Sequence, residues 1–226
     1  LPWSTGVERP QGPRAGSKTW QVIVIGLFRA IVLPMSLLLI LIEACNRITS
    51  GILIGLAPMV TIQELGWTQL TYANWIAITG VTAAVLGVLC SPWIDRVGAL
   101  RILKWLVMFR IGLLGLTAAL EPYWGIHQVF ESFLMINAVA TQLVTVTLIA
   151  LFMRLCSPRV AASQFAVYMA LANMTYSLGS GLMVPLSHWT HQAGIMLVCA
   201  ALIALMWLLI HWVDFERHDQ DLNRLS

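Results

Sequence analysis

Charged residues are scarce in this chain. They make up 10% of its 226 residues, and 59% of the residues are hydrophobic, whereas about 25% of a soluble domain is charged. The net charge of +3 is small and divided among the loops, which argues against a nucleic-acid partner. Because a chain in lipid must satisfy its backbone hydrogen bonds internally, this composition predicts an all-α polytopic membrane protein.

The sequence also lacks the motifs of common metal and catalytic sites. Its four cysteines stand singly, without a CxxC or a Cys/His pattern, so we expect neither a disulfide framework nor a metal site. There is no HExxH, no GxSxG and no pair of aspartates on one helix, which argues against an enzyme. We expect no cofactor.

Six apolar segments are long enough to cross a membrane as helices. They are residues 33–60, 72–92, 102–120, 129–152, 161–186 and 194–213. We expect them to form one six-helix transmembrane bundle within residues 20–213. Proline, glycine and polar residues predict a cytoplasmic linker over residues 1–19, and residues 214–226 are expected to be a cytoplasmic tail. The chain starts without methionine, which suggests a piece of a longer protein.

Outside the spans, Lys and Arg occur only in alternate connections. The connections around Glu64, over residues 121–131 and over residues 187–193 contain neither. By the positive-inside rule, we expect both termini in the cytoplasm and the protein in the cytoplasmic membrane. Tryptophans are expected to form a belt at each boundary. The inner belt would hold Trp20, Trp93, Trp105 and Trp212, and the outer belt Trp67, Trp75, Trp124 and Trp189.

Two opposite charges lie in the middle of the first segment. Glu43 and Arg47 are four residues apart, the spacing at which helix side chains pair. A charged side chain at the bilayer centre costs about 2.5–3.5 kcal/mol on insertion scales, so we expect these two, with Asn46, to face the bundle interior or a wet cavity. Burial favours neutral Glu43 and Arg47 favours its carboxylate, so the two effects oppose each other. Two interpretations stay open: an ion pair that locks two helices, or a substrate or proton site.

Further polar side chains lie within the other spans. They are Arg110 in the third segment, Glu131, Asn137, Thr141 and Gln142 in the fourth, and Asn173 and Tyr176 in the fifth. Asn137 and Thr141 share one helix face because they are four residues apart. Together with the first-segment residues, these are candidates for a substrate or proton pathway. Interhelical hydrogen bonding is an equally good explanation.

Glycine and proline positions predict contacts and bends. Gly51 and Gly55 are four residues apart, and so are Ala83, Gly87 and Ser91, which is the spacing that lets membrane helices approach closely. Candidate bend points, where glycine and proline interrupt membrane helices, are Pro58, Gly179–Gly181 and Pro185.

The connection between the second and third segments carries a recognisable motif. Asp95, Arg96 and Gly98 are followed by Arg101 and preceded by Gly87. Glycine permits a turn that other residues resist, and an aspartate near a helix end can accept backbone N–H bonds or pair with arginine. The stretch resembles the loop signature G-x-x-x-D-R-x-G-R-R of the major facilitator superfamily, which recurs between the second and third helices of each six-helix half. Such a loop would hold two helices together in one conformation and release them in another.

Residues 148–171 narrow the resemblance. They are similar to a helix–loop–helix of the anhydromuropeptide permease and peptide–acetyl-coenzyme A transporter branch. Phe130-Glu131 resembles the start of the preceding helix there, and Leu1-Pro2-Trp3 resembles the segment before the seventh helix. The resemblance implies that this chain is the C-terminal half, helices seven to twelve, of a twelve-helix transporter.

The function implied by this resemblance is secondary active transport of an organic solute, muropeptide-like, by alternating access and driven by protons. The implied partners are a preceding six-helix half of the same protein, the solute, protons and membrane lipid. Glu43 would carry the proton or contact substrate, and Arg47 would hold an anionic group of the solute. Alternatives are a siderophore or other organic-anion carrier of the same superfamily, and a non-transporting membrane receptor or scaffold.

Overall fold

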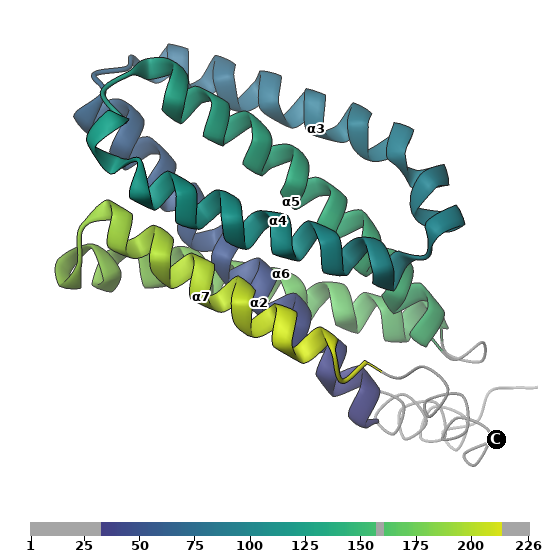
Figure 1. Ribbon diagram of the computed structural model, residues 1–226. Coiled ribbons are helices and arrows are strands. Elements are labelled where there is room, and N and C mark those ends of the chain that lie inside the picture. The colour runs from purple at the N-terminus through teal and green to yellow at the C-terminus, as the bar shows by residue number, and fades with distance from the viewer. Residues whose placement is uncertain (1–32, 157–160, 214–226) are drawn as a thin grey trace, which may run out of the picture.

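The computed structural model of the protein describes residues 33–156 and 161–213, which are almost entirely helical (Figure 1). The elements are α2 (Pro34–Pro58), the π-helix η1 (Met59–Glu64), α3 (Gln69–Val97), α4 (Ala99–Ala119), the 3-10 helix η2 (Glu121–Tyr123), α5 (His127–Leu155), α6 (Ala161–Trp189) and α7 (Gln192–Ile210). Each of the six predicted segments is confirmed as a helix. The predicted linker, residues 1–19, and the predicted tail, residues 214–226, lie outside the described residues.

Hydropathy sets one of the six helices apart. Among the described residues, α2 with η1, α3, α4, α5 and α7 are long and apolar enough to cross a membrane. α6 has 29 residues, ample to cross the hydrocarbon layer, but polar residues such as Gln164, Asn173 and Ser177 lower its hydropathy. Polar side chains are tolerated within a membrane when they face other helices or a cavity rather than lipid.

Local sequence sets where the helices begin and end. Pro34 takes the first position of α2, where its missing N–H costs no hydrogen bond. The Thr68 hydroxyl accepts a hydrogen bond from the Thr71 amide at 3.1 Å and so caps α3. Gly98 alone separates α3 from α4, and its φ of +99° is a value that residues with a Cβ rarely adopt. These boundaries decide which residues lie at mid-span.

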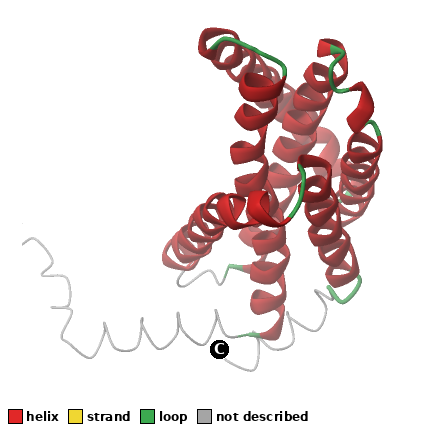
Figure 2. Ribbon diagram, turned by 90° about the vertical axis from the view of Figure 1, so that its left-hand side faces the viewer, coloured by secondary structure: helices red, strands yellow, loops and turns green. Residues whose placement is uncertain are grey.

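The helices pack in two groups of three, with α3, α4 and α5 in one group and α2, α6 and α7 in the other (Figures 1 and 2). α2 packs against α6 and α7, α5 packs against α3 and α4, and α4 and α7 pack against each other. Exchanging α2 with α5, α3 with α6 and α4 with α7 leaves this set of pairs unchanged. This exchange relates α2–α4 to α5–α7, so the described bundle has the packing pattern of two three-helix repeats that are consecutive in the sequence.

α2 and α6 cross at two glycines whose backbones touch. A Cβ on Gly179 would lie 2.8 Å from the Cα of Ile48, and a Cβ on Gly51 would meet the backbone of α6. The close approach predicted at Gly87 of α3 is also confirmed, because Gln142 of α5 lies against it. These glycines therefore serve packing between helices.

The candidate bend points differ in outcome. The α-helical part of α2 ends at Pro58, and the hydrogen bonding changes to that of a π-helix over Met59–Glu64. α6 instead includes Gly179–Gly181 and Pro185 within one helix. Single π-turns often lie at functional sites, so the end of α2 at Pro58 is a better candidate for movement than α6.

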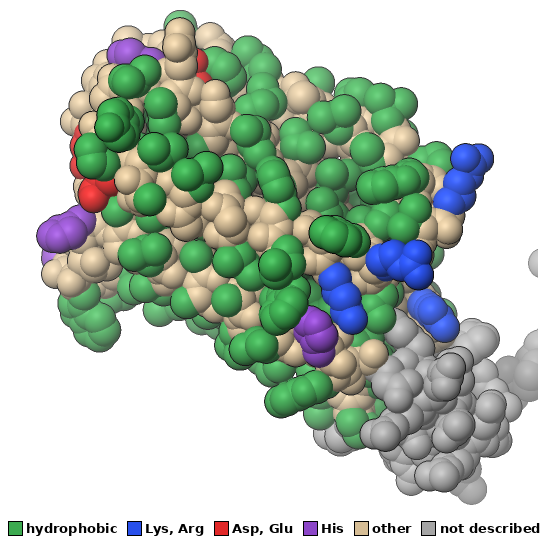
Figure 3. All heavy atoms as spheres, viewed as in Figure 1, with side chains coloured by type: hydrophobic (Ala, Val, Ile, Leu, Met, Phe, Trp, Pro, Cys, Tyr) green, Lys and Arg blue, Asp and Glu red, His purple; other side chains and the backbone are tan. Residues whose placement is uncertain are grey.

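The two ends of the bundle carry opposite charge. Lys and Arg side chains gather at one end, and acidic side chains lie at the other (Figure 3). The basic end holds the turn between α3 and α4 and the end of α5, with Arg96, Arg101, Lys104 and Arg154. The acidic end includes Glu64 and Glu121. This separation is the pattern that the positive-inside rule describes.

The predicted tryptophan belts are only partly present. Trp93, Trp105 and Trp212 at the basic end and Trp189 at the other are 59–85% exposed, as a belt requires. The prediction is wrong for two of the outer tryptophans, Trp67 and Trp124, which are 7% and 3% exposed. The indole N–H of Trp67 donates to Nδ1 of the exposed His127, and that of Trp124 donates to the Thr117 carbonyl inside the bundle, each at 2.9 Å.

Candidate functional site

Glu43 and Arg47 form the ion pair that their spacing predicts. Arg47 Nε donates to Glu43 Oε1 at 2.6 Å, one turn apart on α2. The Glu43 side chain is 4% exposed and the Arg47 side chain 22% exposed. It is the one ion pair within residues 33–156 and 161–213. The carboxylate therefore lies inside the bundle while the guanidinium reaches its surface.

The second carboxylate oxygen of Glu43, Oε2, is buried and makes no hydrogen bond of normal geometry with the residues described. The side-chain amide of Asn46 lies beside the same carboxyl group. Beside Glu43 lies a void of about 10 Å³ between α2, α5 and α6, whose lining includes Tyr168 and Thr175. That volume is close to the least that holds one water molecule. Because a buried polar atom without a partner costs about 1–3 kcal/mol, this oxygen is a place where a water, a proton or a substrate donor would bind.

Arg110 of α4 is completely buried and bonds to α2. Its Nη1 donates to Asn46 Oδ1 at 2.6 Å, and both residues are 0% exposed. The thiol of Cys199, on α7, lies beside the guanidinium. Asn46 stands on the same turn of α2 as the ion pair, so the bond to Arg110 holds that turn against α4. Asn46 and Arg110 lie inside the bundle. Their role in a substrate or proton pathway stays a prediction.

Several polar atoms around this bond lack hydrogen bonds of normal geometry. In the described part of the chain they are Arg110 Nε and Nη2, Asn46 Nδ2 and Thr49 Oγ1. Nearly all buried polar groups in proteins have a partner, either protein or ordered water. The cluster is therefore a place that favours internal water.

The candidate side chains of α5 lie in three environments. Asn137 Oδ1 and Thr141 Oγ1 are buried and have no partner among the described residues. Gln142 packs against Gly87 of α3. Glu131 is half-buried and lines an open cavity of about 320 Å³ between α3 and α5. The structure thus does not bring these side chains together with the ion pair of α2.

The two candidates on α6 lie at the bundle surface. Asn173 is exposed and Tyr176 is half-buried. Their backbone carbonyls accept hydrogen bonds from the hydroxyls of Ser177 at 3.1 Å and Ser180 at 3.3 Å. Within this polar stretch, Thr175 lines the void beside Glu43.

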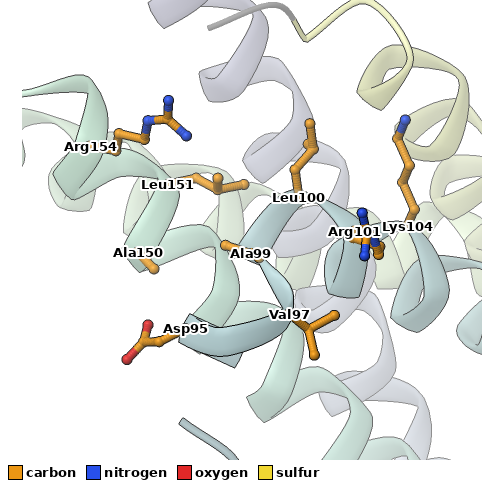
Figure 4. A pocket seen from close by; sticks show the side chains of 10 residues that line it. Asp95, Val97, Ala99, Leu100, Arg101, Lys104, Ala150, Leu151 and Arg154 are labelled. Atoms are coloured by element: carbon orange, nitrogen blue, oxygen red, sulfur yellow. The ribbon is translucent and has the colours of Figure 1, made fainter. Parts of the chain in front are cut away.

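The loop motif folds as a turn of one residue. The positive φ of Gly98 confirms that glycine suits this position. Asp95, Arg96 and Arg101 are all exposed. Within the described residues Asp95 forms neither of the contacts anticipated for it, and its carboxylate points away from Arg101 (Figure 4). Gly87 lies inside α3, before the turn, and packs against Gln142 of α5 instead.

Sequence reasoning misses two buried hydrogen-bonded groups. The Tyr168 hydroxyl donates to Ser36 Oγ at 3.1 Å and accepts from Gln164 Nε2 at 2.6 Å, which joins α6 to the start of α2. Trp67 Nε1 donates to His127 Nδ1 at 2.9 Å. The i, i+4 spacing of Gln164 and Tyr168 was a usable signal. Nothing local connects Trp67 with His127, because 60 residues separate them.

Comparison with known proteins gives one match. A family model described as Major Facilitator Superfamily matches residues 39–224. No curated protein and no solved structure matches the chain. The matched range includes α3 to α7 completely and all but the first residues of α2.

Proposed function

Because this chain belongs to the major facilitator superfamily of secondary transporters, we propose that its six helices form one half of a carrier that moves an organic solute by alternating access. In this family, two six-helix halves are related by an axis along the membrane normal, and each half contains two inverted three-helix repeats. The packing pattern of α2–α4 and α5–α7 agrees with such repeats. The basic end of the bundle is the proposed cytoplasmic side.

Uncovered faces of small residues support a partner half. On α6 the exposed set is Ser163, Ala166, Ala170, Asn173, Ser177 and Gly181, and on α3 it is Ala73, Ala77, Gly80 and Ala84. Steps of three and four residues place each set on one side of its helix. Small residues let membrane helices approach closely. These faces therefore suit a second helical unit better than they suit lipid.

The observation that carries the transport proposal is the partly exposed ion pair of α2. While Glu43 is ionised, it occupies Arg47. A proton on Glu43 removes the charge that holds the guanidinium, and Arg47 is then free to bind an anionic group with its fork of N–H donors. Proton binding and anion binding thus favour each other, and linkage makes the effect reciprocal.

The proposed solute is an organic anion. A carboxylate or phosphate would suit the guanidinium of Arg47. Residues 148–171 favour a muropeptide-like compound as the first candidate, with siderophores and other organic anions as the second. The unpaired Oε2 of Glu43 supplies the place for the transported proton.

Glu43→Gln tests this mechanism, since it keeps the size of the side chain but cannot exchange a proton. We expect the variant, in the complete gene product reconstituted in proteoliposomes, to lose proton-driven accumulation and to keep solute exchange. Arg47→Gln should lose both. Entrapped pyranine would report proton entry as each solute of a panel of anhydromuropeptides, peptides and ferric siderophores is added.

Glu121→Gln is the matched control, because Glu121 is an exposed acid at the far end of the bundle. It should transport normally and insert as well as the other variants. Proton-driven accumulation by Glu43→Gln at the level of this control would refute the assigned role of Glu43.

A further inference from the structure

A large cavity lies at the basic end of the bundle. It has a volume of about 630 Å³ and opens between the α3–α4 turn and the end of α5. Arg101 and Lys104 of α4 stand on one side of it and Arg154 of α5 on the other, with Leu100 and Leu151 between them (Figure 4). Its size falls within the range of ordinary ligand sites, about 300–1,000 Å³.

The charge of the lining favours an anion. Arg101 and Lys104 line the cavity together with one acid, Asp95, whose carboxylate points away from both (Figure 4). Neither Arg101 nor Lys104 forms an ion pair within the described ranges. The first turn of α4 also lines the cavity, and the positive end of its dipole adds to the same potential.

An uncovered apolar surface continues from this cavity along α4. Trp105, Met108, Phe109 and Leu116 are 50–73% exposed, and steps of three, four and seven residues place them on the side of the helix that also carries Arg101. Cations at the end of such a surface, followed by an exposed tryptophan, match the order of headgroup, interface and acyl chains in a bilayer. A soluble anion would use the cavity but not the apolar surface.

From this arrangement we infer that the cavity binds the phosphate of an anionic phospholipid, whose acyl chains lie along the exposed face of α4. Arg101 would grip the phosphate as a fork of donors and Lys104 as a point charge. Basic pockets between membrane helices on the cytoplasmic side are suited to such headgroups. The inference depends on the chain crossing a membrane and not on the solute that it carries.

The test measures lipid binding to the complete gene product purified in detergent. Phosphatidylglycerol and cardiolipin are the probes, phosphatidylcholine is the zwitterionic comparison, and glycerol phosphate is the soluble comparison. Native mass spectrometry gives the bound fraction, and thermal unfolding gives the stabilisation. We expect the two anionic lipids to bind and stabilise the protein, and the two comparison compounds to do neither.

Three variants locate the site. The loss of one basic residue near an anionic surface weakens binding about fivefold. The double variant, Arg101→Gln with Lys104→Gln, should therefore weaken lipid binding about 25-fold. Arg96→Gln is the matched control, since Arg96 is exposed at the same end but does not line the cavity, and it should change binding less than about twofold. Asp95→Asn removes the acid of the lining and should tighten binding severalfold, a gain that misfolding cannot produce.

Three results would overturn the inference. The first is equal binding of phosphatidylcholine and phosphatidylglycerol. The second is an equal loss of binding in Arg96→Gln and in the double variant. The third is stabilisation by glycerol phosphate that the double variant abolishes, which would assign the cavity to a soluble anion.

Discussion

The crossing of α2 and α6 allows a sharp test of the packing, through Gly179→Ala. The new Cβ would lie 2.8 Å from Ile48 Cα and 2.9 Å from the Ile48 carbonyl carbon, whereas ordinary contacts begin near 3.4 Å. The two backbones would have to separate by more than about half an ångström, since neither contact is with a flexible side chain. Overpacking of this kind costs about 1–3 kcal/mol. We therefore expect a lower free energy of unfolding.

Gly181→Ala is the matched control for this change. It makes the same substitution on the same helix two residues later, where a Cβ would meet nothing within 4 Å. Alanine gains about 0.5–1 kcal/mol over glycine inside a helix, and this gain applies equally to both variants. The difference between the two variants is therefore the cost of the clash, about 1–3 kcal/mol, or roughly 2–12 °C in the midpoint of thermal unfolding.

Unfolding in detergent, followed by circular dichroism during titration with dodecyl sulfate and again during heating, would measure both variants. Gly51→Ala should resemble Gly179→Ala, because its Cβ also meets backbone, 2.7 Å from the Ser180 amide nitrogen. The double variant should cost less than the sum, since one separation of the helices relieves both clashes. Equal stability of Gly179→Ala and Gly181→Ala would refute the close crossing.

Three further predictions concern single contacts, each measured by the same unfolding assays. Asn46→Leu should lower the free energy of unfolding by about 1.5–3 kcal/mol, because it leaves the buried guanidinium of Arg110 without its acceptor. Arg110→Met should lower it less, and the double variant should recover part of the loss. His127→Ala should lower the free energy of unfolding by about 1–3 kcal/mol, because the Trp67 N–H loses its acceptor. His127→Gln keeps an acceptor and should lower it less. Equal effects of the two substitutions would contradict the role of this hydrogen bond. Gly98→Ala should lower the free energy of unfolding by about 1–3 kcal/mol. The added Cβ would meet no other atom, so the cost would come from the positive φ alone. An unchanged unfolding midpoint would contradict this strain.

The helices themselves were predictable because the membrane imposes a local requirement. A span needs about 20 apolar residues and must satisfy its own backbone, and both properties can be read along the chain. The predicted segment 102–120 and the observed α4, Ala99–Ala119, differ by a few residues. The boundary lies where Gly98 allows a one-residue turn, which the motif itself contains. The Glu43–Arg47 pair was predictable for the same reason, since its spacing is that of one helical turn.

The partners of distant residues were not predictable. Arg110 was a candidate from its position within a span, but its partner in the structure is Asn46, 64 residues away. Trp67 and Trp93 have the same side chain near a helix end, yet one is 7% exposed and the other 59%. Their difference depends on which helix lies opposite, and hydropathy does not reveal this. Glu131 on α5 and Asn173 on α6 likewise share a segment type with the ion pair but not a location.

Taken alone, the sequence determined the number and length of the spans and the local pairing of Glu43 with Arg47, since lipid penalises any exposed backbone bond or charge wherever it occurs. Only the tertiary structure decided that α2 crosses α6 at Gly51 and Gly179, that Asn46 receives Arg110, and which faces stay uncovered. The reason is that lipid tails and neighbouring helices are equally apolar, so a hydrophobic residue has no signature that distinguishes one from the other.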